Sequence, residues 1–332
     1  MVATVASADA VHVQLCAGLG AEDSARVQRA LDFVQPLYAG KKALTGQDAL
    51  QFAQTAASVL AMLETDADTR IVGLLFELPA LDTAAAERIE AEFGHEIAEF
   101  VAGVRQLIRL HALAFGWQPG GRGKNAAQVS GAQVETLRKM LLAMASDMRV
   151  VLVRMASRVT TLRYLTERKV DNEDARRYAR ETFELYAPLA NRLGVWQLKW
   201  ELEDLSFRLL EPAAYKRIAK MLEERRIERQ SFVQEAITRL QAELAAAGVA
   251  AEVSGRPKHI YSIWNKMRGK ELDFSELYDV RALRVIVGDV KSCYTALGIV
   301  HHIWTPVPSE FDDYISRPKT NGYRSLHTVV TA

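Results

Sequence analysis

Apolar side chains recur every three or four residues through most of the first two thirds of the chain. This spacing puts them on one face of a helix and predicts a mainly helical region between residues 21 and 165. Asp82, Thr83 and Ser130 favour helix starts, and Gly248 favours a helix end. The predicted helices cover residues 48–63, 84–113, 148–165, 195–210 and 215–247.

The pattern changes after residue 248, where short β-branched runs alternate with helical segments. The alternation is typical of an α/β domain. Strands are predicted over residues 249–253, 280–287 and 325–330, and helices over residues 257–268 and 291–302.

A glycine-rich segment, residues 116–131, interrupts the helical pattern and contains a Gly-Lys pair. The phosphate-binding motif G-x-x-x-x-G-K-[ST] does not fit, because its first glycine would fall on Gln118 and Asn125 follows Lys124. No strand precedes the segment either, so a flexible loop is predicted here.

The predicted helix over residues 148–165 carries four arginines, at positions 149, 154, 158 and 163. A solvated helix face with acidic partners explains them more simply than a nucleic-acid-binding patch does.

The overall composition excludes several classes of protein. Among 332 residues, 42 are basic and 41 acidic, so the chain as a whole has no polyanion-binding signature. Cys16 and Cys293 are too few for a disulfide framework or a cysteine-based zinc site. The N-terminus lacks the features of a signal peptide, and no apolar run reaches the roughly 18 residues of a membrane span. A soluble intracellular protein is expected.

The densest chemistry lies in residues 317–328, RPKTNGYRSLHT. Asn-Gly favours a tight turn, so Lys319 and Asn321 are expected on an exposed loop before the last strand. With Tyr323 and His327, this loop offers cations for phosphates and a ring on which a base can stack. A polar hairpin with a packed tyrosine remains equally open.

A second basic group lies at the start of the predicted helix over residues 257–268. Lys258, Ser262 and Lys266 follow at four-residue intervals and would share one face, with Arg256 just before the helix. That face could bind phosphates, and the alternative is a surface helix with ordinary lysines. The opposite, buried face would consist of Ile260, Ile263, Trp264 and Met267.

Acidic residues lie near both basic groups. Asp279 precedes the predicted strand over residues 280–287, where a carboxylate could bind Mg²⁺ or cap the strand. Arg284 would lie on the opposite sheet face from Asp279 in a regular strand. Glu310, Asp312 and Asp313 are either associated with a metal or part of a solvated loop, and the loop is favoured.

Four segments in this order, GRPKHIYSIWNKM, LYDVRALRV, EFDDYI and PKTNGYRSLHT, closely resemble the RelA/SpoT homologue family of (p)ppGpp synthetases. The resemblance implies an α+β multidomain protein. An all-α, HD-like hydrolase domain (residues 1–165) and a helical connector (166–202) would precede an α/β nucleotidyltransferase-like synthetase domain with a mixed sheet (203–332).

The family's activity is the transfer of pyrophosphate from ATP to the 3′-hydroxyl of GDP or GTP. By resemblance, the acceptor nucleotide would contact Lys319, Asn321, Tyr323 and His327, and Asp279 would bind Mg²⁺ as a catalytic residue. The ATP-binding residues would be Arg256, Lys258, Ser262, Lys266 and Arg284.

In relatives, a strand reading roughly E-x-Q-I-R-T follows a short way beyond the position of Ala332, and its Glu completes the metal and base site. The resemblance therefore indicates an N-terminal fragment of a longer protein. The alternative to an active synthetase is a fragment that only binds nucleotide or regulates.

The first half departs from the family's hydrolase, whose metal site, typically for Mn²⁺, is built from histidines and aspartates. Those positions hold Phe52, Phe76, Glu77 and Ser157, which cannot supply that ligand set. An inactive hydrolase domain is therefore expected. The acidic sequence at residues 310–313 is similar to that of family members with synthetase activity alone. This similarity agrees with an inactive hydrolase domain.

The resemblance also implies partners and a location. Besides ATP and GDP or GTP, a ribosome is expected for the full-length protein, and a homo-oligomer is allowed. No membrane or DNA partner is expected, and the location is expected to be cytoplasmic.

Overall fold

The computed structural model describes residues 8–43, 45–115, 147–224, 226–256, 259–270, 282–319 and 322–331. They form two compact units, one of Met1–Ala190 with Trp196–Leu209 and one of Asn191–Val195 with Leu210–Ala332. Among the described helices, none combines the length and apolar character needed to cross a bilayer.

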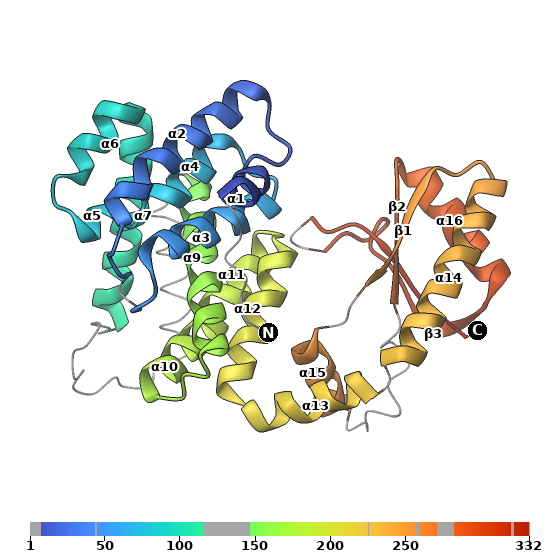
Figure 1. The fold of residues 1–332 in the computed structure, drawn as a ribbon. Coiled ribbons are helices and arrows are strands. Elements are labelled where there is room, and N and C mark those ends of the chain that lie inside the picture. The colour runs from blue at the N-terminus through green and yellow to red at the C-terminus, as the bar shows by residue number, and fades with distance from the viewer. Residues whose placement is uncertain are drawn as a thin grey trace. The chain divides into compact units, whose positions relative to one another are not determined.

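The first unit is built of helices (Figure 1). Helix α3 packs on α4 and α9, α2 covers α4, and α7 contacts α6 and α9. The predicted helix over residues 84–113 is in fact two, α6 and α7, because Gly94 between them has φ of 85°. The elements are α1 (Ala8–Leu15), α2 (Ala21–Tyr38), α3 (Ala49–Met62), α4 (Ala67–Leu75), α5 (Leu78–Leu81), α6 (Ala85–Phe93), α7 (His95–Phe115), α9 (Met148–Glu167), α10 (Glu173–Glu181), the π-helix η1 (Thr182–Tyr186), α11 (Ala187–Arg192) and α12 (Trp196–Leu210).

The close packing of α3 on α4 depends on a glycine. A Cβ at Gly73 would lie 2.7 Å from Leu60 Cδ1 and 3.3 Å from Ala57 Cα, so a larger residue would push the two helices apart. The starts of both helices are capped, because Asp48 and Asp66 accept hydrogen bonds from the backbone N–H three residues on.

The arginines of α9 do not all lie on a solvated face, as the sequence suggested. Arg158 is fully buried, forms an ion pair with Glu181, and lies 4.1 Å and 4.4 Å from the ring centroids of Tyr178 and Tyr186. Arg163 matches the expectation, because it pairs with Glu201 nearer the surface. The sequence pattern could not show that Glu181 provides a buried counter-charge for Arg158.

The second unit combines helices with two two-stranded antiparallel sheets, β1 with β2 and β3 with β4 (Figure 1). The α+β class is confirmed, but the described strands pair only antiparallel, so they do not form the expected mixed sheet. The elements are α13 (Pro212–Glu224), α14 (Arg226–Ala246), β1 (Ala251–Arg256), α15 (Ile260–Lys270), β2 (Ala282–Val287), α16 (Val290–Ile303), β3 (Thr305–Asp313) and β4 (Leu326–Thr331).

Two small apolar cores hold this unit together. Ile263 of α15 packs with Ile218 of α13, and the residues predicted for the buried face of α15 surround them as expected. In the second core, Leu240 and Leu244 of α14 pack with Val253 of β1 and with α16. The predicted helix over residues 215–247 corresponds to α13 and α14, and residue 225 between them lies outside the described residues.

Strand β3 was not predicted from the sequence. Glu310, Asp312 and Asp313 belong to it, so the prediction of an acidic loop is wrong. Prolines at positions 306 and 308 argue against a strand, and the ladder is indeed irregular between Pro306 and Phe311. The loop predicted at residues 116–131 and the helix start predicted at Ser130 lie outside the described residues.

Candidate functional site

Four side chains gather between the end of β3 and the start of β4. The rings of Tyr314 and His327 meet edge to face at 5.2 Å, and Tyr323 completes the group at 6.1 Å from Tyr314. Tyr323 Oη and His327 Nε2 are 2.8 Å apart, within hydrogen-bonding distance. Lys319 Nζ lies 4.2 Å from the centroid of Tyr314, so a cation sits on the aromatic group. We call these four residues the aromatic cluster.

The turn that presents this cluster forms as the sequence predicts. Gly322 has φ of 75°, a conformation that a glycine adopts without strain, and its N–H donates to the carbonyl of Lys319. The N–H of Lys319 in turn donates to the carbonyl of Tyr323. Asn321 lies outside the described residues. Lys319 is exposed to solvent, whereas the ring of Tyr323 is half-buried.

Asp313, at the end of β3, organises the chain that leads into the cluster. One of its oxygens accepts from the N–H groups of Ile315 and Ser316, and the other from the hydroxyls of Ser316 and Tyr294. These hydrogen bonds, first of all the one from the backbone of Ser316, lower the pKa of Asp313. Both oxygens are occupied, which makes Asp313 a turn-capping residue and a poor candidate for a metal ligand.

The predicted ATP-binding residues are only partly described. Ser262 and Lys266 lie one turn apart on α15 and are both half-buried, whereas Lys258 is outside the described residues. In the antiparallel β1–β2 pair, Ser254 pairs with Arg284 and Arg256 with Ala282, so the two arginine positions are close along one ladder. Arg284 is exposed, and Asp279 lies outside the described residues.

In the helical unit, the positions predicted to have lost a metal site carry other contacts. The rings of Phe52 and Phe76 pack 5.7 Å apart and are both buried. Glu77 is buried and forms an ion pair with Arg105 at 3.0 Å. Ser157 donates to the carbonyl of Arg154 and lies 3.3 Å from its guanidinium.

These contacts do not fit a metal. Two phenyl rings provide no ligand atom, and the carboxylate of Glu77 already binds a guanidinium. In the part of the chain that the structure describes, no three His, Cys, Asp or Glu side chains group as a metal site would require. Arg105 thus places a positive charge beside the buried carboxylate of Glu77.

Sequence reasoning missed several residues of these sites. Tyr314 was considered only as part of the EFDDYI segment, although an aromatic residue five positions before Lys319 could have suggested its role. Arg105 lies at a helical position with no recognisable local signal, and Arg154 was predicted only as part of a solvated helix face. The packing of α7 on α9 brings both near Glu77.

Comparison with known proteins gives a different family match for the helical part and for the α+β part of the chain. Residues 30–196 match the family model described as HD domain, and residues 255–332 match the region found in RelA/SpoT proteins. The chain is similar to the GTP pyrophosphokinase of Escherichia coli K12, with 46% identity over 82% of this chain and 35% of that protein.

Two more distant relatives span more of the chain. A probable guanosine-3′,5′-bis(diphosphate) 3′-pyrophosphohydrolase of Synechocystis is 39% identical over 91% of this chain and 38% of its own length. The GTP pyrophosphokinase of Streptomyces coelicolor is 38% identical over 92% of this chain and 34% of its own length.

A helical HD domain followed by the α+β region found in RelA/SpoT proteins defines the class of protein. The chain belongs to the RelA/SpoT family. It spans about a third of the length of the curated relatives that it matches.

Proposed function

We propose that this chain contains the synthetase site that transfers the pyrophosphate group of ATP to the 3′-hydroxyl of GDP or GTP. The observation that carries the proposal is the aromatic cluster, which joins a stacking ring to a cation on the loop shared with the family. The relatives' names, GTP pyrophosphokinase in most cases, support the same activity.

On the acceptor side, the ring of Tyr323 would stack on guanine while Lys319 and Asn321 contact the nucleotide. The hydrogen-bonding distance from Tyr323 to His327 supports this assignment, because it holds the tyrosine ring in one orientation. Stacking on an oriented ring costs less conformational entropy than stacking on a free one.

On the donor side, Lys258, Ser262 and Lys266 would bind the ATP phosphates, and Arg256 and Arg284 the adenine. The four-residue spacing on α15 supports this, since side chains one turn apart can contact successive phosphates. Catalysis would then consist mainly of holding two nucleotides in line and neutralising charge.

Asp279 would hold Mg²⁺, which supplies charge neutralisation on the phosphate oxygens when bound. Asp313 does not fit as a second Mg²⁺ ligand, because both of its carboxylate oxygens accept hydrogen bonds within a turn. A general base must also help ionise the ribose hydroxyl. We assign it to the Glu of the E-x-Q-I-R-T strand of relatives.

The HD domain would not hydrolyse (p)ppGpp. The pairing of Glu77 with Arg105 and the packing of Phe52 on Phe76 support this, because they replace the ligands of a metal-dependent hydrolase. The proposal also keeps the domain boundaries after residues 165 and 202. It further includes ribosome binding by the full-length protein, a homo-oligomer, no DNA or membrane partner, and a cytoplasmic location.

Incubation of the chain with ATP, GDP and Mg²⁺ tests the proposal, with AMP and guanosine tetraphosphate as products. We expect Lys319→Gln to raise the KM for GDP by about tenfold, since a charge-assisted contact to phosphate is lost. Lys291→Gln, which changes an exposed lysine of α16, is the matched control. If both variants behaved alike, Lys319 would not contact the acceptor. GDP binding without AMP formation would favour the alternative of a nucleotide-binding module.

A further inference from the structure

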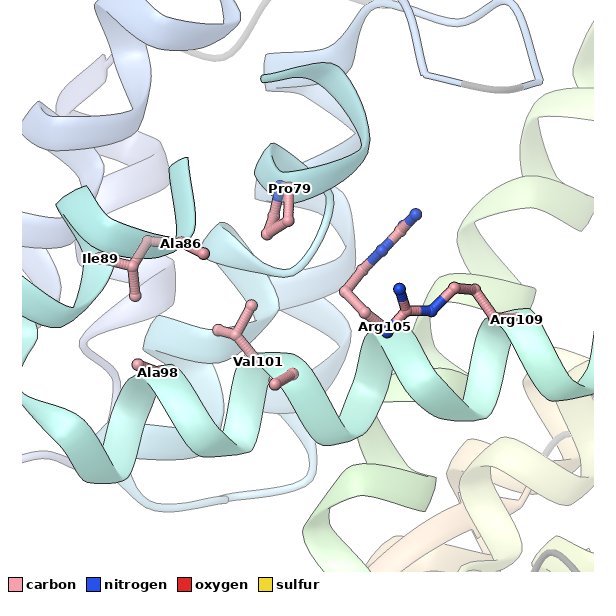
Figure 2. Close-up of a pocket in the computed structure, with 8 residues that line it drawn as sticks. Pro79, Ala86, Ile89, Ala98, Val101, Arg105 and Arg109 are labelled. Carbon is pink, nitrogen blue, oxygen red and sulfur yellow. The ribbon is translucent and has the colours of Figure 1, made fainter. Parts of the chain in front are cut away.

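A pocket of about 230 Å³ lies between α5, α6 and α7 of the helical unit, beside the Glu77–Arg105 ion pair (Figure 2). Its deepest residues, Ile89 and Val101, are almost completely buried. The residues that line it are Pro79, Ala86, Ile89, Ala98, Val101, Ala102, Arg105 and Arg109. Six are apolar and two are cationic, so the pocket is amphipathic.

The two cationic residues close one end of this pocket. Arg105 is mostly buried, with 14% of its side chain exposed, and Arg109, one turn further along α7, extends toward it (Figure 2). Both are well suited to bind a carboxylate through paired N–H donors.

Positive charge exceeds negative charge at this end. Among the described residues, the ionised groups that act most strongly on Arg105 are Glu77, which favours its charged form, and Arg109 and Arg154, which oppose it. Burial and the two neighbouring guanidinium groups lower the pKa of Arg105 despite Glu77. Within the described part of the chain, three cations near the one carboxylate of Glu77 leave a partly buried charge that an anionic ligand would neutralise.

We infer that this pocket binds a small organic carboxylate with an unbranched apolar chain, the chain lying on Ile89 and Val101 and the carboxylate facing Arg105 and Arg109. The inference is independent of the proposed synthetase activity. None of the described lining residues has an aromatic ring on which a nucleobase could stack. The volume is also below the roughly 300–1,000 Å³ of sites for drug-sized molecules, which suits a short chain.

Calorimetric titration of the full chain with octanoate tests the site, with acetate, octanol and inorganic phosphate as probes that each lack one feature. We expect saturable binding of octanoate and much weaker binding of the other three. Arg109→Gln should weaken octanoate binding by about tenfold or more, because a charge-assisted contact is lost. Ala102→Phe, at the exposed rim, should block the pocket.

Arg88→Gln is the matched control, because Arg88 is an exposed arginine of α6 that pairs with Asp82 outside the pocket. Circular dichroism would confirm that each variant is folded. The inference is overturned if octanoate does not bind, if octanol binds equally well, or if Arg109→Gln and Arg88→Gln bind alike. Binding of guanine nucleotide, sensitive to Arg109→Gln and stronger than that of octanoate, would also overturn it.

Discussion

Tyr314 is the residue that ties the proposed acceptor site together, because it contacts the other three members of the aromatic cluster. Its ring packs against His327 and Tyr323 and lies beneath the ammonium group of Lys319. It touches no reacting atom in our proposal and acts as a positioning residue.

Replacing the ring of Tyr314 should therefore change substrate binding more than turnover. We expect Tyr314→Leu to raise the KM for GDP by about three- to tenfold with little change in kcat, since a cation–π contact contributes about 0.5–1 kcal/mol or more. Tyr314→Phe keeps the ring and should behave like the wild type in steady-state kinetics. Equal KM values for the Leu and Phe variants would remove Tyr314 from the site.

Asp313 provides a pH-dependent contribution to stability. Its pKa is lowered in the folded protein, so its contribution is fully present above the ordinary value of 3.8 and is lost as the pH falls through the lowered value. We expect Asp313→Asn to lower the melting temperature at pH 7 and to have a smaller effect near pH 3. Asp312→Asn is the control. A difference from wild type that grew on acidification would contradict the role of the carboxylate.

A buried ion pair joins Glu77, the residue before α5, to Arg105 of α7. Loss of Arg105 would remove an ion pair from the buried Glu77, and breaking a buried ion pair typically costs about 3–5 kcal/mol. Arg105→Leu should therefore lower the free energy of unfolding in urea by about that amount. The double variant Arg105→Leu/Glu77→Leu should recover much of the loss.

The surface ion pair of Arg29 with Glu92 provides the control for the stability measurement on Arg105→Leu. Arg29 and Glu92 are both largely exposed, and Arg29→Leu should change stability by less than about 1 kcal/mol. If Arg105→Leu were as mild as Arg29→Leu, the buried pair would contribute nothing to the helical unit.

Local sequence patterns predicted most individual elements but not their contacts. Periodicity placed α15 and its buried face, and the Asn-Gly sequence indicated the turn closed by Gly322. Strand β3 was missed because Pro306 and Pro308 are poor strand formers, and the bulge that tolerates them depends on pairing with β4. The burial of Arg158 depends on Glu181, a residue of a different helix.

At the scale of the whole molecule, the two units carry opposite chemical features. The described part of the helical unit holds buried arginines and a buried Glu77–Arg105 ion pair, whereas the α+β unit carries a cation and aromatic rings in the aromatic cluster. The family resemblance identified this division from motif residues. The arginines that surround Glu77 became evident only from the packing of α5, α7 and α9, which no single motif encodes.

The central claim, that Tyr323 holds the acceptor guanine during transfer from ATP, is tested most directly by AMP formation at varied GDP. We predict that Tyr323→Ala raises the KM for GDP by about ten- to a hundredfold, since base–aromatic stacking contributes about 1–3 kcal/mol. Tyr323→Phe, which keeps the ring, should stay within a few fold of wild type. Unchanged kinetics for Tyr323→Ala would contradict the account.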